Sequence, residues 1–111
     1  MMEIPVTLTF QTADKQMADE MRQQVANLEI SASDNFIGGT EIAAFFATGK
    51  EAIKTVLGPL LAFLETRQNR IARVQLVVGK DKIEFSGLSA KEIHDLLESD
   101  GLQKAIDSYK P

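Results

Sequence analysis

The chain has 111 residues, of which 44% are hydrophobic and 25% are charged, and its formal net charge at pH 7 is −4. These values are typical of a globular protein, and we expect a single domain over residues 1–111. The absence of cysteine excludes disulfides, thiolate zinc sites and cysteine nucleophiles. The acidic balance argues against nucleic-acid binding, because proteins of that class usually carry a basic excess.

The N-terminal sequence MMEIPVTLTF lacks the basic start and long apolar core of a signal peptide. The most apolar window, residues 56–64, is far shorter than the roughly 20 residues that a membrane-spanning helix needs. We therefore expect a cytoplasmic protein that does not associate with a membrane.

The N-terminal part of the chain combines a strand pattern with a helix pattern. Apolar and polar residues alternate over residues 4–11, which predicts a strand with one buried face. Thr12 is a suitable N-cap for a following helix. Apolar residues then recur at helical spacing, at Met17, Met21, Val25 and Leu28.

The next segment is predicted to contain a short strand, a loop and a short helix. A weaker alternation over residues 28–33 favours the strand. The sequence DNFIGGTE, residues 34–41, favours a loop because of its Asp-Asn and Gly-Gly pairs. Residues 41–47, EIAAFFA, predict a short helix with Ile42, Phe45 and Phe46 on its apolar side.

A long helix is predicted to follow. Thr48 and Glu51 form a T-x-x-E capping box that indicates its start. An apolar stripe at helical spacing runs from Ile53 to Leu64 and continues through Gly58-Pro59. An interior proline costs about 3 kcal/mol or more, so the unbroken stripe implies that packing outweighs this penalty. We expect one kinked helix, with two separate helices as the alternative.

The C-terminal third is predicted to form an antiparallel hairpin and a helix. Two alternating segments, residues 72–78 and 82–86, flank the turn Gly79-Lys80-Asp81. The side chains of the hairpin that face the core would be Val74, Leu76, Val78, Ile83 and Phe85. Ser89 and Glu92 form a second capping box, which starts a helix. A final helical turn or two is expected over residues 102–109.

These elements predict an α+β fold with the order β-α-β-(α)-α-β-β-α, in which the bracketed helix is residues 41–47. The strands alternate instead of forming continuous apolar runs, which indicates a sheet covered on one face only. We therefore expect a two-layer α/β sandwich, with a mixed sheet and all helices on one face.

Three arginines, Arg67, Arg70 and Arg73, lie between the long helix and the hairpin. Arg67 would lie in the last helical turn, where a cation interacts favourably with the helix dipole by ~0.3–1 kcal/mol. Phosphate sites prefer helix N-termini, where backbone N–H groups are free. The cluster is therefore interpreted as a helix end. Nucleic-acid binding through these arginines with Lys50 and Lys54 is an alternative that predicts strong salt dependence.

The sequence contains no recognisable catalytic or ligand-binding motif. The glycine pair at residues 38–39 lacks the lysine and the glycine spacing of a phosphate-binding loop. His94 is the single histidine, and its neighbour Asp95 would not face it on a helix. We therefore expect no catalytic residue, no cofactor and no metal ligand.

The segment from Thr48 to Leu97 carries a family resemblance. Its features are the capped helix TGKEAIKTVLGPLLAFLETR, a strand, a Gly-Lys-Asp turn, KIEFSG and the capped helix SAKEIHDLL. Together with the first strand and helix, residues 4–97 resemble the effector-associated constant component family of bacterial conflict, or immunity, systems. The resemblance implies a small, non-enzymatic α/β accessory component that works beside an effector and a regulatory NTPase or peptidase.

The functional prediction is a protein-interaction module that is not an enzyme. Its partner would be another protein or a second copy of the chain in a homodimer, with no nucleic acid. The predicted contact residues lie on the polar sheet face or in the glycine loop: Phe36, Ile37, Arg73, Gln75, Val77 and Glu84, with Thr7 and Thr9 beside them. The alternative is a small-ligand-binding domain or minor enzyme with a pocket between helices and sheet.

Overall fold

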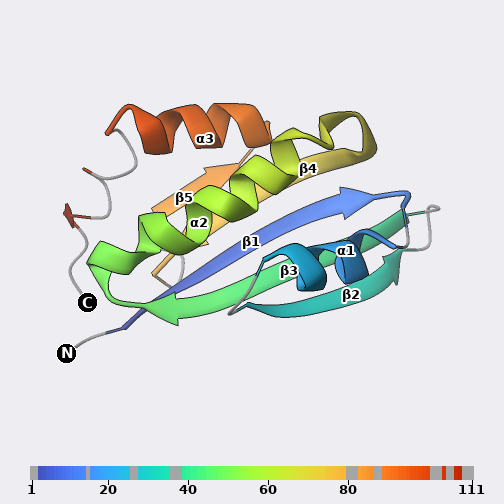
Figure 1. Ribbon diagram of the computed structural model, residues 1–111, viewed down its shortest axis with the longest axis horizontal. Helices are drawn as coiled ribbons and strands as arrows, with labels where there is room; N and C mark the ends of the chain where they lie inside the picture. The colour runs from blue at the N-terminus through green and yellow to red at the C-terminus, as the bar shows by residue number, and fades with distance from the viewer. Residues whose placement is uncertain are drawn as a thin grey trace.

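A five-stranded sheet forms one layer of the molecule, and three helices cover one of its faces (Figure 1). This computed structural model describes residues 3–14, 16–25, 28–35, 39–79, 83–86, 89–100, 104, 107 and 108. The α+β sandwich with helices on one face is confirmed. The predicted mixed sheet is wrong, because all four ladders between the strands are antiparallel.

The order of the strands in the sheet is β2-β3-β1-β4-β5. The strands are β1 (Ile4–Thr12), β2 (Glu29–Asn35), β3 (Gly39–Thr48), β4 (Ile71–Val78) and β5 (Ile83–Ser86). The helices are α1 (Met17–Gln24), α2 (Lys50–Glu65) and α3 (Ala90–Glu98), and a 3₁₀ turn, η1 (Gln68–Arg70), precedes β4. The elements from β1 to β4 follow the β-α-β-β-α-β order of a split β-α-β unit. That order explains why β1 lies at the centre of the sheet.

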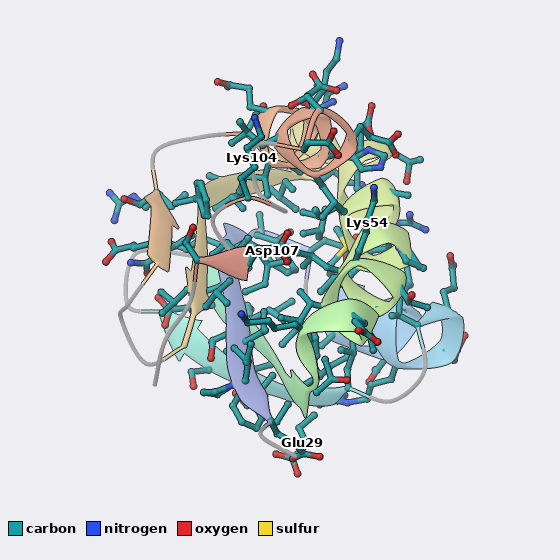
Figure 2. The ribbon with its side chains drawn as sticks, turned by 90° about the vertical axis from the view of Figure 1, so that its left-hand side faces the viewer. Glu29, Lys54, Lys104 and Asp107 are labelled. Atoms are coloured by element: carbon teal, nitrogen blue, oxygen red, sulfur yellow. The ribbon has the colours of Figure 1, made fainter. Side chains whose placement is uncertain are left out.

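The core lies between the sheet and the helices. Alternate residues of β1 are buried, as the period-two pattern predicts, and they face the apolar stripe of α2. Among the described residues, no helix lies on the opposite face of the sheet (Figure 2). Fully buried side chains come from both layers: Ile4, Leu8, Phe10, Met17, Met21, Ile42, Ile53, Leu57, Leu60, Leu61, Leu64 and Leu76.

Residues 41–47 belong to β3, so the predicted short helix is wrong. Ile42, Phe45 and Phe46 fit a helical face, but residues 40, 42, 44 and 46 also alternate at period two and are all buried. β3 pairs with β1 on one side and β2 on the other. Two ladders of hydrogen bonds and a buried face outweigh the helical preference of the alanines, because strand formation depends on packing context.

α2 is one continuous helix that contains Pro59, so the single-helix prediction is confirmed and the two-helix alternative is wrong. The predicted capping box at Thr48 is also wrong. Thr48 is the last residue of β3, where it pairs with Ile4, and the N-cap of α2 is Gly49, which has no side chain to supply a cap bond.

Thr12 likewise ends β1 and does not cap α1, whose N-cap is Gln16. The Thr12 hydroxyl donates a hydrogen bond to the Arg70 carbonyl (2.6 Å) and accepts one from the Asp14 backbone N–H (3.0 Å). The residue therefore joins the ends of β1 and η1, which are far apart in sequence.

The capping box of α3 is present as predicted. The Ser89 hydroxyl accepts a hydrogen bond from the Glu92 N–H, and the Glu92 carboxylate accepts one from the Ser89 N–H. Ser89→Ala should lower the free energy of unfolding by about 1 kcal/mol, because one N–H of the first turn loses its partner. Urea denaturation measures this loss. Ser89→Thr, which keeps the hydroxyl, should retain most of the stability, and an equal loss in both variants would contradict a capping role.

The predicted hairpin is confirmed as β4 and β5. Its first strand, β4, is irregular where it pairs with β1. The register between β1 and β4 shifts between Thr9 and Gln11, which marks a β-bulge. Arg73 lies at the bulge with a φ of 53°, an uncommon conformation for a residue with a side chain. Beyond the hairpin, the final turn expected over residues 102–109 falls mostly outside the described residues.

Candidate interaction surface

The open face of the sheet is the side opposite the helices. We define it by the residues that alternate with the buried ones: 5, 7, 9 and 11 of β1; 29, 31 and 33 of β2; 41, 43, 45 and 47 of β3; 75 and 77 of β4; and 84 and 86 of β5. Cross-strand partners lie side by side on one face, so the ladders arrange these residues in rows across the five strands.

The central row takes one residue from each strand. Across the sheet it consists of Glu29, Phe45, Thr7, Val77 and Glu84. Phe45 is the large hydrophobic side chain that stands exposed among the described residues, with an exposed fraction of 39%. The row therefore has a carboxylate at each end and two apolar side chains, Phe45 and Val77, on either side of Thr7.

The neighbouring row is small and polar. It consists of Ser31, Ala43, Thr9, Gln75 and Ser86. The Gln75 amide donates a hydrogen bond to the Glu84 carboxylate (2.9 Å), which links the two rows at the β5 edge.

The charge of the open face is negative. Glu29, Glu41 and Glu84 are exposed, and none of the residues that define the face is lysine or arginine. A partner surface would have to supply the cations, because like charges brought together across an interface oppose association.

The predicted contact residues fall into three groups. Gln75, Val77 and Glu84 lie together on the open face, in the first two rows. Simple alternation along β4 would place Arg73 on the open face next to Gln75. Arg73 instead lies at the bulge and lines a cavity near α3. Phe36 and Ile37 lie outside the described residues.

Sequence reasoning missed Phe45 and Glu29. Phe45 falls in the segment that was predicted to be a helix, and the continuous apolar run over residues 42–47 carries no period-two strand signal. Glu29 could be placed in the central row only once the register between β2 and β3 was known.

Two arginines of the cluster, Arg67 and Arg70, make structural contacts. The Arg67 guanidinium lies 3.8 Å from the centre of the Phe63 ring, and its Nε lies 3.2 Å from a Glu20 carboxylate oxygen. It also donates a hydrogen bond to the Phe63 carbonyl, although α2 ends two residues earlier than Arg67. Arg70 pairs with Asp14 at 2.8 Å. These contacts support the interpretation of Arg67 and Arg70 as structural.

Arg67→Ala should lower the free energy of unfolding by about 1–2 kcal/mol, since it removes a cation–π contact and a partly buried ion pair. Thermal or urea denaturation measures the change. In a double-mutant cycle with Glu20→Gln, the two losses should be less than additive. Full additivity would show that the ion pair contributes nothing.

A cavity of about 360 Å³ lies where β4 begins, beside the start of α3. Its lining includes Gln68, Ile71, Ala72, Arg73, Val74, Ser89, Ala90 and Glu92. The polar groups of Ser89 and Glu92 are already used by the capping box. Arg73 makes no hydrogen bond or ion pair with any residue that the structure describes, so its guanidinium is the charged lining group available to a ligand.

His94 joins α3 to the end of α2. Its Nδ1 lies 2.7 Å from a Glu65 carboxylate oxygen, and its Nε2 lies 3.4 Å from one of Glu98, with the side chain 23% exposed. Within the described ranges, no group of three histidine or acidic side chains could hold a metal ion. The described helices also include none long and apolar enough to cross a bilayer.

Comparison with known proteins finds no matching protein-family model, no matching curated protein and no matching solved structure. The likeness to the effector-associated constant component family therefore stays a prediction from the sequence pattern.

Proposed function

We propose that this protein is a non-enzymatic interaction module that binds another protein on its open sheet face. The observation that carries the proposal is the central row, with Phe45 and Val77 in the middle and Glu29 and Glu84 at the ends. Four strand spacings place the two carboxylates about 19 Å apart. An apolar centre with a charged margin is the usual arrangement of a protein-binding patch.

The charge of this face indicates the chemistry of the partner. Three exposed carboxylates, with no lysine or arginine among the described residues that define the face, favour a partner that brings lysine or arginine around an apolar centre. They disfavour nucleic acid, whose phosphates are also negative. They equally disfavour face-to-face stacking of two copies, which would bring six carboxylates together.

Site-specific photo-cross-linking tests the proposal. A photoreactive phenylalanine analogue at position 45 should cross-link a partner in lysate of the source cell. The same analogue at Lys54, exposed in the helix layer (Figure 2), should not. The captured protein should then bind the purified chain with an affinity that falls as salt rises, because salt screens the exposed carboxylates. Equal labelling from both positions would contradict the proposal.

The accessory role in a bacterial conflict system is part of the same proposal and depends on the sequence resemblance alone. It predicts that the gene lies beside genes for an effector and a regulatory NTPase or peptidase. It also predicts that the cross-linked partner is encoded there. A partner encoded elsewhere, together with an unrelated gene neighbourhood, would remove this role and leave the interaction module.

Binding of a small ligand is a second candidate function, and the cavity beside Arg73 favours it. A volume of about 360 Å³ lies within the usual range of roughly 300–1,000 Å³ for ligand pockets. The Arg73 guanidinium, which pairs with none of the described residues, would suit a carboxylate or phosphate group. A thermal-shift screen of small carboxylates and phosphates should give a rise in melting temperature that Arg73→Ala abolishes. No rise with any compound would exclude this candidate.

A further inference from the structure

The two edges of the sheet differ in how they are protected against pairing with another strand. β5 is an edge strand of only four residues and carries a charge at Glu84. β2, at the other edge, has seven residues and pairs with β3 without a register shift (Figure 1). Proteins usually protect edges with charges, prolines, bulges or short strands. Residues 30–33 of β2 have none of these, and Ser31, Ala32 and Ser33 are exposed.

We propose that β2 pairs with β2 of a second copy of this chain, antiparallel, about a two-fold axis at Ala32. This register uses all seven residues of the strand. It places Ile30 opposite Asp34, Ser31 opposite Ser33, and Ala32 opposite its own counterpart. The two five-stranded sheets would then form one continuous sheet.

The sequence of β2 is self-complementary in this register. The pairs at the centre are small and uncharged, so the two backbones meet without steric obstruction. At the ends, Glu29 lies opposite Asn35 and Asp34 lies opposite Ile30, so no two carboxylates are direct neighbours. Like charges directly opposite each other would destabilise the pairing.

A second observation supports the same register. The Arg22 guanidinium, on α1, pairs with Asp19 (2.9 Å) and donates a hydrogen bond to the Ile30 carbonyl (3.1 Å), which holds the cation beside Ile30 at the sheet edge. Asp34 shares the helix-covered face with Ile30, since their partners on β3, Thr40 and Ala44, are both buried. Asp34 of the second copy would therefore stand next to Arg22.

Within one chain these two groups are apart. Asp34 is four residues from Ile30 along an extended strand, or about 13 Å. Its carboxylate forms no hydrogen bond or ion pair with the described part of the chain. The two-fold axis would bring Asp34 of each copy to Arg22 of the other, so the dimer would gain two ion pairs that the monomer lacks.

Pairing of single strands buries little surface, so the dimer should be weak and concentration-dependent. Its interface is the edge of the sheet and leaves the open face of both copies accessible. The inference is therefore independent of the proposed function. Variants at Phe45 test the open face, and variants at Arg22 and Asp34 test the edge.

Sedimentation velocity over a wide range of protein concentration provides the test. The unmodified chain should show a monomer–dimer equilibrium. Arg22→Glu and Asp34→Lys should each weaken dimerisation at least about tenfold, because each brings like charges together twice. An equimolar mixture of the two variants should dimerise again, since the heterodimer has one original ion pair and one ion pair with its charges reversed.

The matched control is Glu84→Lys, a reversal of charge at the opposite edge, which should leave the dimer unchanged. Circular dichroism verifies that each variant is folded. A chain that stays monomeric at every concentration would overturn the proposal. So would a dimer that is insensitive to both variants, one that Glu84→Lys abolishes, or a mixture that fails to re-form it.

Discussion

Phe10→Ala is expected to lower the free energy of unfolding by about 3–5 kcal/mol. Phe10 is fully buried on β1, the central strand, which pairs with β3 on one side and β4 on the other. Phe10 lies opposite the bulge at Arg73, where β4 has one more residue than β1. Strands paired on both sides cannot move inward easily, so the deletion should leave a cavity. Urea denaturation measures the loss.

The matched control is Phe45→Ala, the same substitution on the neighbouring strand but on the opposite face. Phe45 is partly exposed to solvent, so the change should cost about 1 kcal/mol or less. A loss equal to that of Phe10→Ala would mean that the open face is covered by structure, and it would contradict the assignment of this face as a binding surface.

Phe45→Ala is also expected to weaken partner binding by at least about 2 kcal/mol, or roughly 30-fold. The aromatic ring stands between Glu29 and Thr7 in the central row, and a bound partner would exclude water from it. Isothermal titration calorimetry with the protein captured from position 45 measures the change. The stability of the variant, known from the first experiment, separates loss of contact from loss of fold.

Two further variants set the scale of this effect. Glu29→Gln and Glu84→Gln, at the ends of the row, should mainly slow association and reduce its dependence on salt, because rim charges steer encounter more than they hold the complex. If these variants weaken binding and Phe45→Ala does not, the interface is electrostatic and the apolar centre has no part in it.

The patterns that predicted structure correctly share one property: each depends on residues that are close together in the sequence. The alternation of β1 indicated a half-buried strand. The Ser89-x-x-Glu92 pattern forms a capping box within a single turn. The apolar stripe of α2 is long enough to outweigh one proline, so the helix continues through Pro59.

The predictions that failed concern segments whose sequence suits two structures. Residues 41–47 are compatible with a helix and with a strand, and the choice was made by pairing with β1 and β2. The same error hid Phe45, the large exposed hydrophobic side chain of the open face among the described residues. The capping box expected at Thr48 failed for a related reason, because β3 continues through that residue.

The amino-acid sequence by itself determined that the protein has an α+β fold whose helices carry an apolar face, since the period of the hydrophobic pattern is a local property. It also determined the negative charge and the absence of cysteine chemistry. Only the tertiary structure decided which strands are neighbours, and therefore that Glu29, Phe45, Val77 and Glu84 form one row. It also decided that β2 is an edge strand of the sheet, and the longer of the two. Strand order depends on contacts between residues far apart in the chain, which no local pattern specifies.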